Sequence, residues 1–395
     1  MNLRVNLSRY VYLMLCAAFF FNPVLEAPKN IFFGIALILF VFSLLNERIS
    51  LSLFDWFILF FAPALLLASM WSTFPVKASA FVDVFRYMMV FFIISKIRLN
   101  NSQKLNLIVV AGLGTVVAIF YGAYIHFHLG IGDYWELPSV GHVNHSAIYA
   151  VIMASMISSV LILNWGGVKI RNKVLLITTL FIISYYIFVG ESRAAFAIYC
   201  IVVLLQVLFL FSSNKKAAIF GLSFFAFILT VLVFSDVRVV QKQESLIKSN
   251  NILSYRSEIW NVAMHSNDVN FIFGVGKNNF NKIDMTLVGI NDANGERVKA
   301  ISHAHNIYVN TFAETGIIGF SMYAIYFLCL FYLLLIYSRQ VFLKNGEADR
   351  AYWLGAFSTL LVTLGIGLVN TTFHHEHALI SVLAFSLFIN KARED

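Results

Sequence analysis

The chain has 395 residues, of which 60% are hydrophobic, 16% are aromatic and only 12% are charged. Soluble domains carry roughly 25% charged residues, so this composition excludes an ordinary water-soluble enzyme and predicts a membrane protein. The net charge of +8 follows from basic residues in short polar connections, as is usual in membrane proteins, and gives no reason to expect a nucleic-acid partner.

Apolar windows recur along the chain, and windows of roughly 20 residues can cross a bilayer core of about 30 Å. We therefore predict an all-α, polytopic membrane protein with about twelve transmembrane helices. The predicted spans are 10–26, 31–46, 53–71, 79–95, 105–125, 146–164, 174–190, 194–213, 217–235, 316–337, 351–369 and 377–390.

The fourth predicted span contains two charged residues, Asp83 and Arg86. Charged side chains within a membrane are costly unless they pair with each other or serve a function. The i,i+3 spacing places both on one helix face, where they can form an ion pair. Arg86 is also a candidate substrate-binding residue.

Basic residues predict the orientation of the spans. The two termini and alternate short connections carry most of the 28 Lys and Arg residues, as in the run Lys169, Arg171 and Lys173. By the positive-inside rule, we expect both termini in the cytoplasm. All ten histidines then fall on or near the outer face. A shared function would explain this distribution, but the exclusion of histidine from lipid and from the basic connections explains it equally well.

One predicted connection is much longer than the others and divides the chain into three parts. Residues 1–235 form an N-terminal bundle of about nine spans, 236–304 form a large outer loop, and 305–395 form a C-terminal segment of about three spans. Within the loop, 252–265 has a helical pattern with Ser254 as a plausible N-cap. A long loop in a helical bundle is a candidate for function.

Two arginines are candidates for binding an anion. Arg193 begins a hydrophobic helix, where a guanidinium is costly unless it contacts a phosphate or a carboxylate. The alternative is that Arg193 pairs with Glu191 or extends to the membrane surface. Arg256 lies four residues before Trp260, and a cation beside an aromatic residue suits a lipid-linked phosphate. A solvated charge with an interfacial tryptophan explains the second pair equally well.

The segment His303-Ala304-His305-Asn306 precedes a long apolar run. A neutral imidazole here can act as a general base toward a hydroxyl. Zinc binding together with the later histidines is a second reading, but no cysteine and no His-Glu-x-x-His spacing supports it, so we expect no metal ligands and no cofactor. A third reading is that Asn306 or Ser302 caps the following helix.

A second histidine-rich segment, Thr371 to His377, contains His374, His375 and His377 and precedes the last predicted span. This segment can line the same cavity as His305. It can equally be an ordinary polar turn between two helices.

Taken in order, these residues resemble the signature of the O-antigen ligase and O-antigen polymerase superfamily of bacterial membrane glycosyltransferases. The resemblance covers about residues 190 to 320 and implies a GT-C-like helical protein with one large periplasmic loop. The residues that carry it are Ser192-Arg193, Ser254-Tyr255-Arg256 with Trp260, Gly274-Val275-Gly276, and His305-Asn306 followed after nine residues by Gly316-Ile317-Ile318-Gly319.

The resemblance implies an inverting, metal-independent glycosyl transfer on the periplasmic side of the bacterial inner membrane. The donor would be an undecaprenyl-diphosphate-linked O-antigen, and the acceptor of a ligase would be a sugar hydroxyl of lipid A-core, both held in membrane lipid. Carried over to this chain, His305 is the catalytic base and Arg193 and Arg256 bind the diphosphate. Further substrate-binding candidates are His303, Asn306, Trp260 and Arg86.

Two alternatives remain beside the ligase. An O-antigen polymerase, which joins lipid-linked repeat units, shares the same signature, although the motif spacing and the single long loop favour the ligase. A lipid-linked glycan transporter belongs to a different class and would place charged residues or broken helices at mid-membrane in two matching halves. In this sequence the polar residues gather on one side of the membrane instead.

Overall fold

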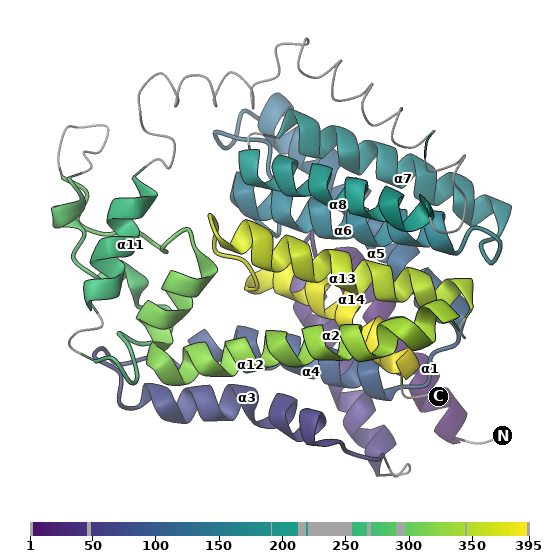
Figure 1. Ribbon diagram of the computed structural model, residues 1–395, viewed down its shortest axis with the longest axis horizontal. Helices are drawn as coiled ribbons and strands as arrows, with labels where there is room; N and C mark the ends of the chain where they lie inside the picture. The colour runs from purple at the N-terminus through teal and green to yellow at the C-terminus, as the bar shows by residue number, and fades with distance from the viewer. Residues whose placement is uncertain are drawn as a thin grey trace.

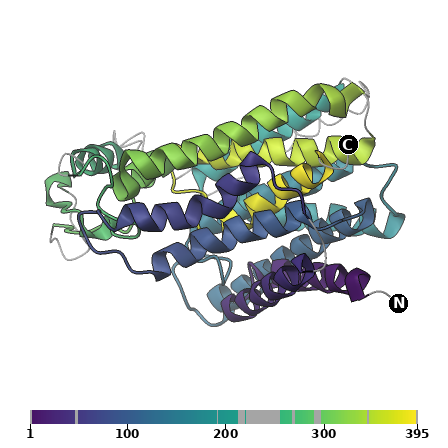
Figure 2. The same ribbon diagram turned by 90° about the horizontal axis from the view of Figure 1, so that it is seen from below.

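The computed structural model describes residues 3–45, 49–190, 192–211, 219, 255–266, 270–289, 297–343 and 346–392. Over these residues the regular structure is helical, as predicted. Most of the helices run along one long axis, with α11 (Arg256–His265) at one end and both chain termini toward the other (Figures 1 and 2). The fold therefore has two distinct ends.

The predicted spans overlap observed helices, except for 217–235, of which the structure describes only residue 219. Five described helices are long and apolar enough to cross a membrane, namely α2, α5 with its π-helical extension η1 (Tyr124–His128), α6, α7 and α12. The chain is thus an integral membrane protein, while the figure of about twelve crossings stays a prediction. The helices are α1 (Leu3–Phe21), α2 (Glu26–Leu44), α3 (Leu53–Ser69), α4 (Ser79–Lys96), α5 (Asn101–Ala123), α6 (Val143–Leu163), α7 (Ile170–Val189), α8 (Arg193–Phe211), α12 (Ile307–Leu343), α13 (Glu347–Gly367) and α14 (His375–Ala392).

The first two helices lie several residues earlier than the predicted spans 10–26 and 31–46. Proline explains the shift, because Pro23 has no N–H and ends α1 in a turn whose next two amides donate to the Phe21 carbonyl at 3.0 Å. Hydropathy does not register this break, since the turn is itself largely apolar. The consequence is that Lys29 lies inside α2, where its side chain is fully buried.

Helix α6 occupies the centre of the bundle, with 83% of its apolar window buried, and it packs against α13, α7, α8 and α14. A buried amide ties three of these helices together. The Gln206 side-chain nitrogen donates to Ser159 on α6 and to Ser358 on α13, each at 3.0 Å. Hydrogen bonds between small polar residues are a usual way to associate helices in lipid. The bundle core is therefore a rigid support for the residues at its ends.

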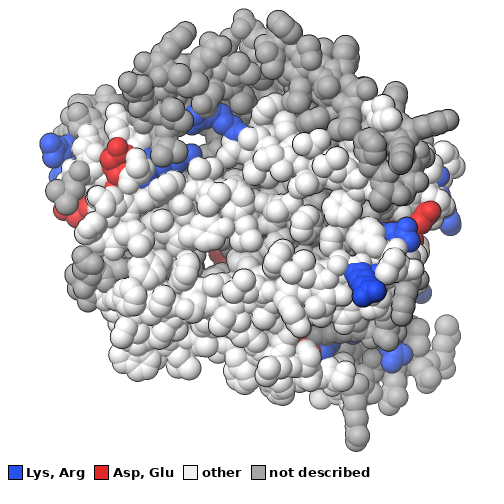
Figure 3. Space-filling model, viewed as in Figure 1, with Lys and Arg blue, Asp and Glu red and all other residues white. Residues whose placement is uncertain are grey.

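The outer surface of the bundle is largely apolar. Helices α2, α7 and α12 have only 28% of their apolar windows buried, so most of those side chains face outward. One broad face is almost free of charged residues, and the Lys, Arg, Asp and Glu atoms lie mainly toward its two ends (Figure 3). Such a surface suits lipid around the middle of the molecule and water at either end.

Helix α12 begins at Ile307, before the predicted span 316–337, and is kinked at Gly316 (φ 60°, ψ −164°). The kink arises because the glycine-rich segment 271–276 packs directly against the helix backbone. The Val275 amide donates to the Ala313 carbonyl at 2.9 Å, and the Ile317 amide donates to the Phe271 carbonyl at 3.0 Å. The two motif elements Gly-Val-Gly and Gly-x-x-Gly are therefore parts of one structural unit.

Both glycines at this crossing are needed for steric reasons. A Cβ on Gly316 would lie 2.3 Å from the Ile272 carbonyl oxygen, and one on Gly274 would lie 2.6 Å from the Ala313 carbonyl oxygen. Both residues also have left-handed φ angles of 60° and 70°. The unit places the next residues of the loop, beginning at Lys277, beside the start of α12.

The loop helix is shorter than the predicted 252–265. It begins at Arg256, after Tyr255 in the left-handed conformation, and it buries Ile259 and Ala263. The proposed N-cap, Ser254, lies outside the described residues. The helical prediction is confirmed for the part that the structure describes.

Candidate functional site

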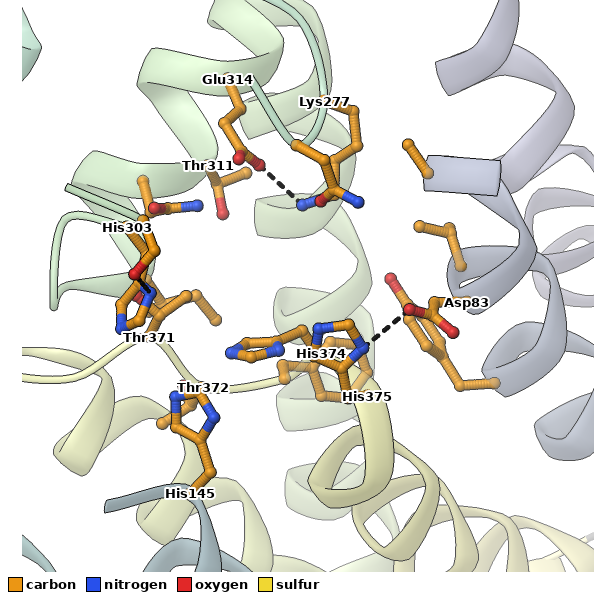
Figure 4. Close-up of a pocket in the computed structure, with 18 of the residues that line it drawn as sticks. Asp83, His145, Lys277, His303, Thr311, Glu314, Thr371, Thr372, His374 and His375 are labelled. Carbon is orange, nitrogen blue, oxygen red and sulfur yellow. Dashed lines mark hydrogen bonds and ion pairs between the residues drawn. The ribbon is translucent and has the colours of Figure 1, made fainter. Parts of the chain in front are cut away.

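At the end of the bundle that carries α11, five segments surround a cavity of about 490 Å³. These are the starts of α4, α6 and α12, the glycine-rich loop, and the connection between α13 and α14 (Figure 4). The volume falls in the range of about 300–1,000 Å³ that small-molecule sites occupy. Its polar lining includes Asp83, His142, His145, Lys277, Asn278, Ser302, His303, Asn310, Thr311, Glu314, Thr371, Thr372, His374 and His375.

Seven of the ten histidines lie together at this cavity, as the histidine cluster. Their rings form a connected set in which neighbouring centroids are 4.4 to 5.6 Å apart. His145 is central, with four other rings around it. Exclusion from lipid does not explain such close packing. The members are His142, His145, His303, His305, His374, His375 and His377.

The backbone between His303 and His305 is held from two sides. The Ala304 amide donates to the Asn310 side chain at 3.0 Å, and the Trp260 indole N–H donates to the Ala304 carbonyl at 2.9 Å. His305 has a left-handed φ of 51°, and its ring centroid is 4.4 Å from that of His303. Trp260 thus positions the histidine segment through its backbone, and direct contact between Trp260 and substrate stays a prediction.

Asn306 caps the start of α12, which was one of the alternatives drawn from the sequence. Its side-chain oxygen accepts from the amides of Tyr308 and Val309 at 2.9 and 3.1 Å, which satisfies two free donors at the start of α12. Its side-chain nitrogen donates to the Leu368 carbonyl at 2.9 Å, just after α13. Asn306 therefore joins two helices beside His305, and its predicted contact with substrate is untested.

His305 lies near Arg256, and Arg256 in turn lies near Arg193. Burial lowers the pKa of His305 to about 3, with further contributions from His303 and then from the Arg256 guanidinium, while a hydrogen bond with Asn370 acts in the opposite direction. Burial also lowers the pKa of Arg256, and the neighbouring charge of Arg193 adds to this effect. With its pKa lowered, the His305 imidazole is neutral at pH 7, and the neighbouring Arg256 guanidinium is a group that suits an anion.

The cavity lining includes His303 but neither arginine. Burial lowers the pKa of His303 to about 4, with smaller effects from His142 and His375. Its Nδ1 lies 2.7 Å from the Ser302 hydroxyl. His303 therefore forms the link between the cavity on one side and the group of His305 and the arginines on the other.

The predicted pair within α4 is confirmed. An Arg86 guanidinium nitrogen lies 2.6 Å from one Asp83 carboxylate oxygen. His375 Nδ1 lies 2.8 Å from the other oxygen (Figure 4). Arg86 also donates to the Asn30 side chain. Asp83 lines the cavity, whereas Arg86 supports it from behind, and its predicted contact with substrate stays untested.

Sequence reasoning missed one ion pair inside the cavity. Lys277 Nζ lies 2.7 Å from a Glu314 carboxylate oxygen, and both side chains line the space opposite the histidines (Figure 4). Burial acts to lower the pKa of Lys277, but Glu314 and Tyr323 outweigh it and the pKa is raised. The available signal was a lysine directly after the Gly-Val-Gly element.

A second ion pair, which sequence reasoning also missed, holds the segment that carries His374, His375 and His377. Lys29 on α2 pairs with Glu376, and both side chains are buried. Asn22 donates to the Glu376 carbonyl at 3.2 Å, so the end of α1 holds the same residue. A lone lysine near the start of an apolar helix was the signal for this contact. Its partner lies 347 positions away and was not predictable.

Three members of the histidine cluster have the geometry of a metal site. A ligating nitrogen of His145, of His374 and of His377 can each be chosen so that all lie within 4.8 Å of one another. His377 is 1% exposed, and neither of its ring nitrogens has a hydrogen-bond partner among the described residues. An unpartnered buried polar group costs about 1–3 kcal/mol. The sequence prediction of no metal ligands rested on spacing, which does not report contacts between distant helices.

Part of this chain matches a known protein family. Residues 178–324 match a family described as O-antigen ligase. Over this region the chain is similar to the O-antigen ligase family. This family covers ligases and polymerases, and its members transfer polyprenyl-linked glycans, so the resemblance found in the sequence is confirmed. A comparison with curated proteins finds no match.

The matched residues include the parts of the candidate site that come from α8, α11, the glycine-rich loop and the start of α12. They therefore include Arg193, Arg256 and His305. The remaining walls of the cavity, which carry Asp83 and most of the histidine cluster, come from the rest of the chain.

Proposed function

We propose that this protein is an O-antigen ligase that transfers a polysaccharide from undecaprenyl diphosphate to a sugar hydroxyl of lipid A-core on the periplasmic side of the inner membrane. The observation that carries the proposal is the grouping of His305, Arg256 and Arg193 within the matched domain. Besides burial, the Arg256 charge lowers the pKa of His305 and the Arg193 charge lowers the pKa of Arg256, which supports a site formed by three separate segments.

The two arginines bind the diphosphate of the donor. A guanidinium presents a planar fork of N–H donors that matches phosphate oxygens, and partial burial strengthens each hydrogen bond. As the bond between the anomeric carbon and the diphosphate oxygen breaks, negative charge grows on the leaving group. The arginines stabilise that charge, so the departing undecaprenyl diphosphate needs no proton from an acid.

His305 acts on the acceptor. Its neutral imidazole takes the proton of the acceptor hydroxyl as the hydroxyl oxygen forms a bond to the anomeric carbon. Attack opposite to the leaving diphosphate inverts the configuration at that carbon. A pKa of about 3 makes a weak base, but the negative charge of bound diphosphate opposes the arginines and raises the pKa. Donor binding therefore makes His305 a stronger base.

The cavity takes the acceptor sugar. It combines two carboxylates, several hydroxyls and imidazoles with apolar walls, which are the groups that hydrogen-bond and pack against sugar rings. His303 lines this space, and its ring lies 4.4 Å from the ring of His305. An acceptor held there would lie beside His303 and so close to the base.

A genetic complementation experiment tests the function. A strain lacking the gene should make no polymer-capped lipopolysaccharide while polymerised glycan accumulates on undecaprenyl diphosphate. Wild-type protein should restore the capped bands, and His305→Ala should not, at equal levels in the membrane. His128→Ala is the matched control, because His128 is exposed and lies outside the histidine cluster. This variant should restore capping.

Two outcomes would change the assignment. If the deletion strain instead carries a single repeat unit on lipid A-core, the protein is an O-antigen polymerase and its acceptor is a second lipid-linked repeat. If His305→Ala restores normal capping, His305 is not the base.

A further inference from the structure

The first turns of α6 and α14 bring three imidazoles to one point. His145 comes from α6, His377 from α14, and His374 directly precedes α14. Their ring centroids are 4.5 to 5.2 Å apart, and the candidate ligand nitrogens lie within 4.8 Å of one another. In a tetrahedral zinc site with bonds of about 2.0–2.1 Å, ligand nitrogens are about 3.3–3.4 Å apart. Small side-chain rotations would close the difference.

His377 supplies an independent observation. Its side chain is almost completely buried, and neither ring nitrogen has a hydrogen-bond partner within the described ranges. Buried polar atoms in proteins are nearly always satisfied, and an exception calls for an explanation such as an ion. The rings beside it are other imidazoles, so a cation that all three nitrogens share would satisfy them together.

The ligand segment is held in place by contacts that do not involve the three imidazoles. Glu376 is fixed by its ion pair with Lys29, and the Thr372 hydroxyl donates to the Thr363 carbonyl at 2.7 Å. Phe373 and His375 have left-handed φ angles of 60° and 47°, conformations that persist only where the surroundings enforce them. Such supporting contacts preorganise a metal site before the ion arrives.

We propose that His145, His374 and His377 bind one transition-metal ion of the zinc class, with an open coordination position toward the cavity. Three neutral imidazoles with no carboxylate favour zinc, cobalt, nickel or copper over magnesium or calcium. His145 and His374 line the cavity and His377 lies behind them, so the open position faces the acceptor space. The ion joins α6 to the start of α14 and sets the shape of that wall.

The inference goes beyond the proposed transfer reaction, in which His305 and the arginines act without a metal. The three ligands also lie outside residues 178–324, so the family match says nothing about them. Metal binding and glycan transfer are therefore separate properties of the chain and can be measured separately.

The test is metal binding by the full-length protein in detergent, purified with a tag that contains no histidine, stripped with a chelator and titrated with Zn²⁺ or Co²⁺. We expect about one ion per chain and the visible absorption of tetrahedral Co²⁺. His145→Ala and His377→Ala should each weaken binding by at least about 100-fold, since loss of a ligand exceeds the loss of a supporting residue. His128→Ala and His305→Ala should bind as wild type.

Two results would overturn the inference. The first is wild-type protein that binds no stoichiometric metal at concentrations up to those that saturate ordinary zinc sites. The second is unchanged binding in His145→Ala and His377→Ala, which would mean adventitious binding elsewhere. His145→Gln and His377→Gln, checked by size-exclusion profile, exclude misfolding as the cause of a loss. A metal-binding but transfer-inactive His305→Ala protein would separate this inference from the proposed function.

Discussion

Arg193 and Arg256 come from α8 and α11 and are brought close enough for one charge to lower the pKa of the other. Like charges repel, so this arrangement is costly in the free protein and becomes favourable when an anion binds between them. In the proposed function, the charge of a bound diphosphate would offset the repulsion between the two guanidiniums. This arrangement suits a diphosphate donor and also its release after transfer.

A lysine substitution tests whether the fork of each guanidinium matters. We expect Arg193→Lys and Arg256→Lys each to reduce kcat/KM for transfer by about 100-fold, because a point charge does not replace two directed donors on a developing anion. The measurement is transfer by purified protein from a lipid-linked donor. Arg297→Lys is the control, because Arg297 is exposed, and it should retain activity. Near wild-type rates for the first two variants would contradict the diphosphate role.

The lowered pKa of His305 predicts an unusual pH dependence. Protonation removes the base, so a pKa of about 3 in the free protein keeps His305 active well below pH 6.5. The profile of kcat/KM should therefore show no inflection near pH 6.5 from this residue. Bound diphosphate raises the pKa, so the acid limb of kcat should lie at higher pH than that of kcat/KM. A shared inflection of both profiles at pH 6.5 would mean an imidazole that is neither buried nor influenced by arginine.

Backbone strain is concentrated around the candidate site. All non-glycine residues with left-handed φ among those described lie in the site or border it. Each such residue costs about 1–3 kcal/mol, which surrounding contacts must offset, as the Trp260 and Asn310 hydrogen bonds to Ala304 do beside His305. The residues are His142, Tyr255, Asn278, His305, Phe373 and His375.

The glycine-rich loop crosses α12, and this crossing forms the wall of the cavity that carries Lys277 and Glu314. Backbone hydrogen bonds replace side-chain packing there, which holds Lys277 beside Glu314. The helix kink at Gly316 is therefore caused by an inserted segment and not by the local helix preference of the sequence. A hydropathy window cannot detect such an insertion, and this explains why the predicted span began at the kink.

An alanine at Gly274 tests this crossing. Its Cβ would lie 2.6 Å from the Ala313 oxygen at a φ of 70°, so we expect a loss of about 2–4 kcal/mol in the free energy of unfolding. The readout is the midpoint of thermal unfolding in detergent, followed by transfer activity. Gly130→Ala is the matched control, with a φ of 64° and no atom within 4 Å, and should cost about 1 kcal/mol. Equal effects of both would show that the close approach is unimportant.

Across the whole molecule, the cavity and α11 lie at one end of the bundle and both chain termini lie toward the other (Figure 2). This arrangement gives the orientation prediction a physical test, because a membrane-impermeant reagent reaches only one end in intact cells. The native cysteines are partly buried in helices and can be replaced first by alanine. They are Cys16, Cys200 and Cys329.

We expect Glu258→Cys on α11 to react with a membrane-impermeant maleimide in intact spheroplasts. Gly346→Cys, in the exposed connection before α13, should react only after permeabilisation, because the positive-inside rule places that connection in the cytoplasm. The measurement is mass shift after labelling of single-cysteine proteins. The reverse pattern would place the cavity on the cytoplasmic side and would exclude a periplasmic acceptor.

The sequence alone determined the all-helical membrane class, the family resemblance and the identity of His305, Arg193 and Arg256 as candidates. The membrane class and the family resemblance are supported because hydropathy is a local property and because the signature elements follow one another in a fixed order along the chain. The roles of the three candidate residues stay predictions. The sequence also predicted the Asp83–Arg86 pair, since an i,i+3 contact depends only on helix geometry.

The tertiary structure decided which distant residues meet. Lys29 pairs with Glu376 across 347 positions, and His145 joins His374 and His377 from a different helix. No periodicity in the sequence encodes such contacts, because they depend on how helices stack and where each helix begins. A shift of one helix turn would move these side chains by about 5.4 Å and separate them, so packing, not local pattern, determines the cavity and its histidine cluster.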